Sequence, residues 1–162
     1  MSFESLHAEI VILDGRQSAT AAAICRGTSR LLRSLGFACI PELSLASGRR
    51  ADIVALADDG ELWIVEVKSS ITDFRVDQKW PEYRYHCDRL FFATAGHVPL
   101  DIFPEDAGLI LADGYGAEIV RDAPEHRMAA STRRGVLLRF ARAAALRLQS
   151  SSDPQSSFGM DF

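Results

Sequence analysis

Hydrophobic positions along the chain switch between helix-like and strand-like spacing. From Ser18 to about Leu35, apolar and small side chains recur every three or four residues, which predicts an amphipathic helix. Ser18 suits the N-cap of this helix and Gly36 its C-terminal end. A long helix is predicted over 125–148, beginning properly near Ser131. Between 73 and 87 we expect one or two helical turns interrupted by Pro81.

Shorter apolar runs predict strands, at 37–45, 51–57, 61–68, 88–95, 108–113 and 117–121. Pro41 makes the first of these an edge or bulged strand. Asp58-Asp59-Gly60 suits a three-residue hairpin turn that joins the second run to the third. Residues 3–13 fit either a short strand or an arm packed on the core. The Ser-rich segment 149–162 predicts a disordered tail, which leaves one domain over 1–148.

The predicted hairpin is apolar on both faces. Ile53, Ala55, Trp63 and Val65 share one face, while Val54, Leu56, Leu62 and Ile64 share the other. A sheet with two apolar faces must be covered on both sides. We therefore expect an α/β fold, with a mixed central sheet flanked by helices.

Composition narrows the class of protein. With 162 residues, 48% hydrophobic and 25% charged, the chain fits one soluble globular domain. Its apolar runs are far shorter than the roughly 20 residues of a membrane span, and no secretion signal is recognisable, so we expect a cytoplasmic protein with no membrane partner. Three cysteines without paired spacing argue against a disulfide framework or a cysteine zinc site.

The formal net charge of −4 argues against nonspecific coating of nucleic acid, but the basic residues are clustered. The segment Arg127–Arg147 contains six arginines and no acid. Arg26, Arg30 and Arg33 recur at roughly helical spacing, and Arg49-Arg50 lies just before Asp52. Such clusters fit either solvated helix faces or a surface that binds phosphates.

Three polar side chains interrupt one apolar face of the hairpin: Asp52, Glu66 and Lys68. If the turn is centred on Asp59, paired residue numbers sum to 118, and Asp52 lies opposite Glu66 with Cβ atoms about 4.5–5.5 Å apart. Two facing carboxylates are destabilising unless a cation lies between them, and Mg²⁺ or Mn²⁺ is such a cation. Lys68 would then orient or activate water, or neutralise charge on a phosphate. The alternative is a structural Glu66–Lys68 pair with Asp52 at the rim.

The segments GRRADIVAL (48–56) and WIVEVKSS (63–70) resemble the active-site hairpin of the PD-(D/E)XK, or restriction-endonuclease-like, nuclease superfamily. Carried over by position, Asp52 and Glu66 are the metal-binding acids and Lys68 is the catalytic lysine. Segments 14–32, 77–93 and 108–121 also resemble the MmcB-type bacterial DNA repair proteins, which are assigned the same fold. The resemblance implies a DNA repair role, DNA as partner and, as in many proteins of this fold, a homodimer.

Many members of the superfamily carry an additional metal-supporting Glu on the first helix, whereas Ile24 to Leu35 contains no acid. Glu42, on the strand before the hairpin, could replace it or be a plain surface residue. The remaining candidates for substrate binding are Gln78, Tyr83, Arg26 and Arg50.

Two functions of different class follow. The first is a metal-dependent DNA endonuclease that hydrolyses phosphodiester bonds. The second is an inactive nuclease-fold module that binds DNA or a repair protein without cutting. An interaction domain unconnected to nucleic acid is a third possibility, and it predicts no salt-dependent affinity for DNA.

Overall fold

The fold is a mixed sheet between helices, and the computed structural model describes residues 18–156 of the chain. Its strands are β1 Ala38–Ser44, β2 Arg50–Leu56, β3 Leu62–Val67, β4 Arg89–Thr94, β5 Gly108–Ala112 and β6 Ala117–Arg121. Its helices are α2 Ala19–Ser34, α3 Ile71–Val76 and α4 Ala130–Ser152, with 3₁₀ turns η1 Trp80–His86, η2 Leu100–Ile102 and η3 Pro154–Ser156. The predicted segment 3–13 lies outside the described residues.

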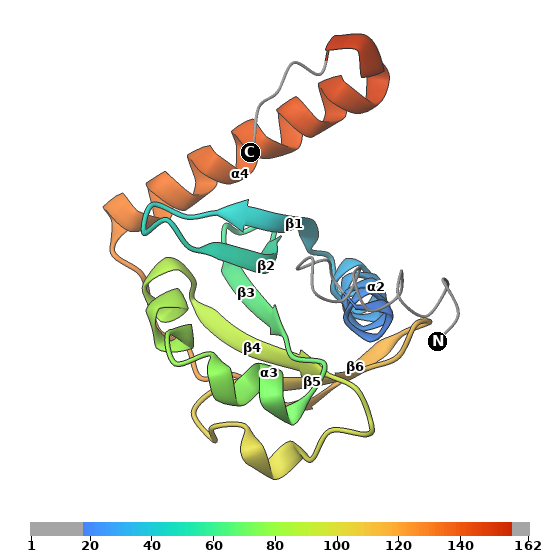
Figure 1. Cartoon of the computed structure of the whole chain (residues 1–162). Coiled ribbons are helices and arrows are strands. Elements are labelled where there is room, and N and C mark those ends of the chain that lie inside the picture. The colour runs from blue at the N-terminus through green and yellow to red at the C-terminus, as the bar shows by residue number, and fades with distance from the viewer. Residues whose placement is uncertain (1–17, 157–162) are drawn as a thin grey trace, which may run out of the picture.

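The strands are ordered β1-β2-β3-β4-β5-β6 in one sheet (Figure 1). Strands β1, β2 and β3 pair antiparallel, β3, β4 and β5 pair parallel, and β6 returns antiparallel to β5. The sheet is therefore mixed, as expected, and β1 with its Pro41 is an edge strand. The predicted order of helices and strands over the described residues is confirmed.

Local signals explain where the elements begin and end. The Ser18 side chain accepts a hydrogen bond from the Ala21 amide and caps α2, while Gly36 follows the helix with φ 90°. The Asp58-Asp59-Gly60 turn joins β2 to β3, and Gly60 takes the left-handed conformation that its φ of 93° requires. Both predictions are confirmed.

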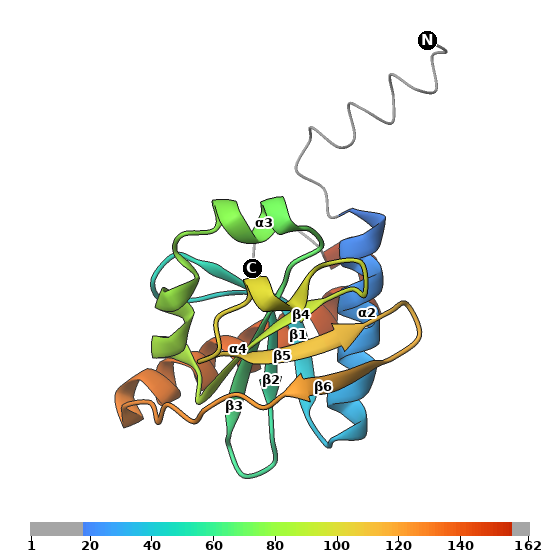
Figure 2. The ribbon, with the colours of Figure 1, turned by 90° about the horizontal axis from the view of Figure 1, so that it is seen from below.

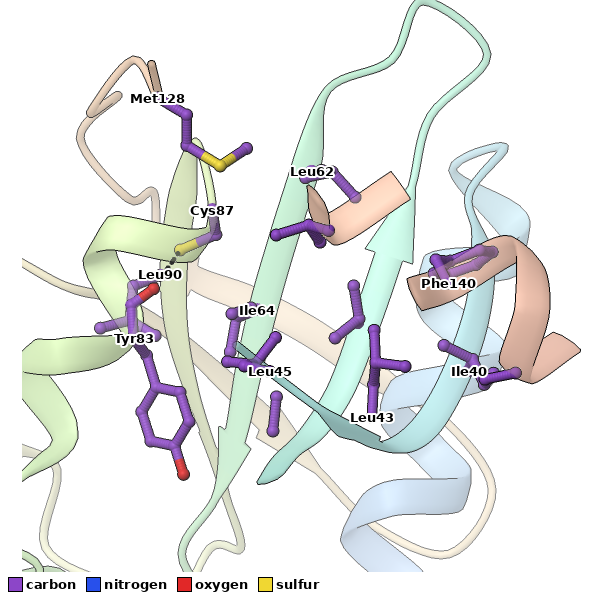
Figure 3. Packing of buried hydrophobic residues seen from close by; sticks show 14 residues of the cluster. Ile40, Leu43, Leu45, Leu62, Ile64, Tyr83, Cys87, Leu90, Met128 and Phe140 are labelled. Carbon is purple, nitrogen blue, oxygen red and sulfur yellow. Dashed lines mark hydrogen bonds between the residues drawn. The ribbon is translucent and has the colours of Figure 1, made fainter. Parts of the chain in front are cut away.

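The two apolar faces of the sheet are covered by different helices (Figures 1 and 2). Ile24 and Leu32 of α2 pack with Ile53 and Val65 on one face. On the other face, Phe140 of α4 joins a cluster with Val54, Leu62, Ile64 and neighbouring apolar residues (Figure 3). Burial of both faces fixes the sheet in the middle layer.

Helix α4 extends further than predicted. Residues 149–152, expected to belong to the disordered tail, continue the helix as far as Ser152. The Ser152 hydroxyl donates to the Leu148 carbonyl, and the Asp153 amide donates to the Gln149 carbonyl, so local hydrogen bonds carry the helix past its last buried residue. Residues 157–162 of the predicted tail lie outside the described residues. No helix of the described part is long and apolar enough to cross a membrane.

Candidate active site

Two carboxylates face each other where β2 begins and β3 ends. Ile53 pairs with Val65 and Val54 with Ile64, which confirms the predicted register, and the next step places Asp52 opposite Glu66. The Asp52 amide donates to Glu66 Oε1 over 3.1 Å, and the Val67 amide donates to Asp52 Oδ2 over 2.8 Å. The carboxylates thus replace the main-chain ladder at this end of the hairpin, and their positions are fixed by the strands.

Burial makes this pair electrostatically costly. The Glu66 side chain is only 3% exposed, and burial together with the neighbouring Asp52 charge raises its pKa well above the ordinary value. Burial also raises the pKa of Asp52, opposed by the Val67 amide, the positive charge of Lys68 and a hydrogen bond from the Glu66 carboxyl. Ionisation of both carboxyls is thus disfavoured, and that of Glu66 most strongly.

Lys68 continues the same line of residues and is held firmly. Its amide donates to the Ala93 carbonyl and its carbonyl accepts from the Thr94 hydroxyl, which fixes its backbone beside β4. Its ammonium lies 2.7 Å from Asp77 Oδ2, and the two side chains are 10% and 18% exposed. Asp77 follows α3, so this short helix positions the counter-charge of the lysine.

Asp77 is a site residue that the sequence analysis missed. Its only sequence signal is general, because a lysine predicted to lie on an apolar face needs an acidic partner when it is buried. Nothing in the spacing from Lys68 to Asp77 identifies which acid that is. The position of α3 over the end of the sheet makes the choice.

Tyr83 approaches the carboxylates from η1. Its ring is 6% exposed and its hydroxyl donates to the Arg50 carbonyl over 3.0 Å. Burial and the charges of Glu66 and Asp52 raise its pKa to about 12, so it stays a neutral donor at physiological pH. Figure 3 shows the ring extending from the buried cluster with its hydroxyl directed away from it.

Glu42 lies on the neighbouring edge strand. Pro41 pairs with Ile53 and Leu43 with Ala51, so the β1 register brings Glu42 level with Asp52, although Glu42 itself adopts φ 52°. Its charge raises the pKa of Asp52, while its carboxylate is exposed and 3.9 Å from the Arg50 guanidinium. Glu42 and Arg50 therefore form the solvent-exposed rim of the carboxylate pair.

The structure gives two other predicted substrate residues different partners. The Gln78 amide nitrogen donates to the Arg75 carbonyl at the end of α3. The Arg26 guanidinium donates to the Gly114 carbonyl in the β5–β6 turn. Both side chains hold local structure, and neither is bonded to the residues of the carboxylate site.

Asp52 and Glu66 are the two carboxylates that could hold a divalent cation of the magnesium type at this site. The negative charge of Asp52 helps to raise the pKa of Glu66, a repulsion that a cation held by the two carboxylates would relieve. Mg²⁺ is commonly held by one or two carboxylates completed by water and phosphate. Among residues 18–156, no group of three or more His, Cys, Asp or Glu is placed to hold a metal. The substrate phosphate would therefore have to complete the coordination.

Comparisons with known proteins place the chain in a family. A solved structure, the SPO1766 protein of unknown function from Silicibacter pomeroyi, is 39% identical, with a TM-score of 0.85 over 90% of this chain and 100% of that chain. No curated protein matches the chain. The family model described as DNA repair protein MmcB-like matches residues 8–155 and so spans the whole sheet and its helices. The chain therefore belongs to the MmcB-like family of DNA repair proteins.

Proposed function

We propose that this protein is a Mg²⁺- or Mn²⁺-dependent DNA endonuclease of the PD-(D/E)XK, restriction-endonuclease-like type. One observation carries the proposal: a buried carboxylate, Glu66, and a partly buried one, Asp52, face each other across a hairpin, with the buried Lys68 on the same strand as Glu66. Membership in a DNA repair family makes DNA the substrate that this chemistry suits best. The expected cytoplasmic location and homodimer stay predictions.

Asp52 and Glu66 would hold the metal, which supplies Lewis-acid polarisation of the phosphate. One oxygen of each carboxylate accepts from a main-chain amide of the hairpin, which holds both side chains in place before a ligand binds. Lys68, fixed by Asp77, presents a positive charge beside them that can orient the attacking water and offset charge developing on the phosphate. Arg50 lies exposed at the rim, where the DNA backbone would enter.

A cleavage assay tests the proposal directly. Duplex, single-stranded and branched DNAs are incubated with Mg²⁺ or Mn²⁺ and with the wild type, Asp52→Asn or Lys68→Ala. Asparagine keeps an oxygen that can accept from the Val67 amide, so Asp52→Asn should retain the fold and lose at least about 100-fold in cleavage rate. Asp106→Asn, which alters an exposed ion pair, is the control and should cut normally. Cleavage that survives Asp52→Asn would contradict the assignment.

A second function is supported by the donor set itself. Helix α2 has no acid, and residues 18–156 offer no group of three metal ligands, so a nuclease-fold module that binds DNA or a repair protein without cutting is the alternative. Salt-sensitive DNA binding by a wild type that cuts no substrate with either metal would establish this alternative. Activity of the wild type that is lost on chelation would exclude it.

A further inference from the structure

The arginines around α4 fall into two groups by their contacts. Arg133 donates to the Asp88 carboxylate and to the Gly60 carbonyl. Arg147 donates to the carbonyls of Pro41 and Glu42. These two side chains are used to attach the helix to the sheet, one near the β2–β3 turn and the other at β1.

The other four arginines point outward from this region and are exposed: Arg127, Arg134, Arg139 and Arg142. Within residues 18–156 none of the four forms an ion pair with a carboxylate. The chain has no acid between Glu125 and Asp153 that could neutralise them locally. Arg139 instead lies near His86, and burial together with the positive charge of Arg139 lowers the pKa of His86. A protein with a net charge of −4 thus concentrates uncompensated positive charge along one helix.

The basic cluster on α2 differs in this respect. Arg26 donates to the Gly114 carbonyl and Arg30 to the Tyr115 carbonyl, each over 3.0 Å. Both guanidinium groups are therefore hydrogen-bonded to the main chain of the β5–β6 turn. Their charges are part of the contact between helix and hairpin. The sequence presents both clusters as equally available. The structure bonds two of the three α2 arginines to a turn and leaves Arg33 exposed, so the exposed α4 arginines form the larger group without such bonds among the described residues.

We propose that the exposed face of α4 carrying Arg134, Arg139 and Arg142 binds the sugar-phosphate backbone of duplex DNA. Arg134 and Arg142 are two helical steps of four residues apart, which separates them by about 12 Å along the axis. This span is similar to the width of the major groove, about 12 Å, so the two side chains can reach phosphates on either side of it. Charge complementarity favours a polyanion, because arginine contacts to phosphate supply most nonspecific DNA affinity.

Helix α4 lies next to the strand that borders the carboxylate site, so DNA bound on the arginine face of α4 could reach that site. This part of the proposal rests on the proposed function. Arg147 ties the helix to Pro41 and Glu42, and the Glu42 charge acts on Asp52. Figure 1 shows α4 lying across β1 and continuing past the edge of the sheet. DNA bound along α4 would therefore extend from the helix toward the rim formed by Glu42 and Arg50.

The test is the salt dependence of DNA binding, measured by fluorescence anisotropy with a labelled duplex between about 50 and 200 mM salt. All variants carry Asp52→Asn so that the duplex stays intact. The triple variant Arg134→Ala/Arg139→Ala/Arg142→Ala should bind more weakly, with a log–log salt slope shallower by about 2.7, or about 0.9 for each lost phosphate contact. Arg30→Ala, which removes a charge already bonded to the Tyr115 carbonyl, is the control and should keep the slope of its parent.

The possible outcomes distinguish failure of the proposed α4 surface from failure of the proposed nuclease function. A triple variant with an unchanged slope, in a protein that binds DNA and whose wild type cuts it, overturns the α4 surface and leaves the proposed function standing. A parent without salt-dependent DNA affinity overturns the α4 surface, and a wild type that also cuts no substrate overturns the proposed function as well. Leu138 is 54% exposed on the same helix, so sedimentation is measured in parallel. A dimer that dissociates in the triple variant while the slope persists would assign the face to a second copy and overturn DNA binding there.

Discussion

Asp77→Asn provides a sharp perturbation of the candidate site, because it removes one charge and leaves the side-chain shape. In the native protein Asp77 Oδ2 lies 2.7 Å from the Lys68 ammonium, with both side chains mostly buried. Asparagine can still offer an oxygen to Lys68, but it cannot balance the charge. The ammonium, which already interacts with Asp52 and Glu66, would be drawn toward those carboxylates and would compete there with the metal.

The structure sets the size of the effect. A hydrogen bond to a charged group contributes about 1.5–3 kcal/mol net, and deleting one partner of a buried ion pair costs about 3–5 kcal/mol. Because asparagine keeps the acceptor oxygen, we expect Asp77→Asn to lie at the lower end, with a loss of about 1.5–3 kcal/mol in unfolding free energy. A similar loss in the transition state corresponds to a cleavage rate reduced by about 10- to 100-fold.

Single-turnover cleavage and urea denaturation measure the two effects on the same preparations. The wild type, Asp77→Asn, Lys68→Ala and the double variant form a double-mutant cycle. If Asp77 acts through Lys68, Asp77→Asn should produce no further loss of rate in the Lys68→Ala background. The half-saturating Mg²⁺ concentration should rise in Asp77→Asn, and in the double variant it should equal that of Lys68→Ala, because the competing ammonium is then absent.

The cycle can refute this assignment. Rate losses that simply multiply would mean that Asp77 acts on catalysis independently of Lys68, and an Asp77→Asn enzyme with wild-type rate would remove it from the site. Asp106→Asn again serves as the control, because the Arg84–Asp106 pair is more exposed and should contribute only about 0–1 kcal/mol.

Three further predictions concern stability. The pKa of folded Glu66 is raised above its ordinary 4.5, so its contribution to stability is full below that value and is lost as the pH rises through the folded-state pKa. Urea denaturation between about pH 5 and pH 8 should therefore show a shallower fall in unfolding free energy for Glu66→Gln, and parallel wild-type and variant curves would contradict this. In Gly27→Ala the new Cβ would lie 2.1 and 2.5 Å from the Asp113 and Gly116 carbonyl oxygens, so the unfolding free energy should fall by about 1–3 kcal/mol. Gly135→Ala on α4 places its Cβ in open space and should raise the unfolding free energy by about 0.5–1 kcal/mol. Thr28 is fully buried and its hydroxyl has no hydrogen-bond partner among the described residues, so Thr28→Val should raise the unfolding free energy by about 1 kcal/mol and Thr28→Ser should not.

The sequence predicted the central hairpin because the signals involved are local. Side chains alternate faces along each strand, and the turn ending in Gly60 fixes which residues of β2 and β3 are opposite. The facing of Asp52 and Glu66 follows from those two facts alone. Helix α2 was equally accessible, because Ser18 and Gly36 mark its ends through contacts within a few residues.

The end of α4 and the partners of individual polar side chains had no such signal. The C-terminal end of α4 was predicted too early, since polar residues 149–152 suggested a tail while main-chain hydrogen bonds continued the helix. The sequence predicted Gln78 and Arg26 as substrate residues, which stays a prediction, and it gave no sign that these side chains would donate to the Arg75 and Gly114 carbonyls. Composition and spacing show that a side chain can donate a hydrogen bond, but not which acceptor the fold brings to it.

By itself, then, the sequence determined the sheet hairpin, its two apolar faces and the opposed carboxylates, because backbone alternation and turn geometry act over a few residues. Only the tertiary structure decided that Asp77 holds Lys68 and that Tyr83 reaches the Arg50 carbonyl. It likewise decided that Arg26 and Arg30, although exposed, donate to the carbonyls of a turn, whereas Arg134 and Arg142 pair with no carboxylate among the described residues. The physical reason is that hydrogen bonds and ion pairs depend on distances of about 3 Å between side chains, which packing of helices against the sheet sets.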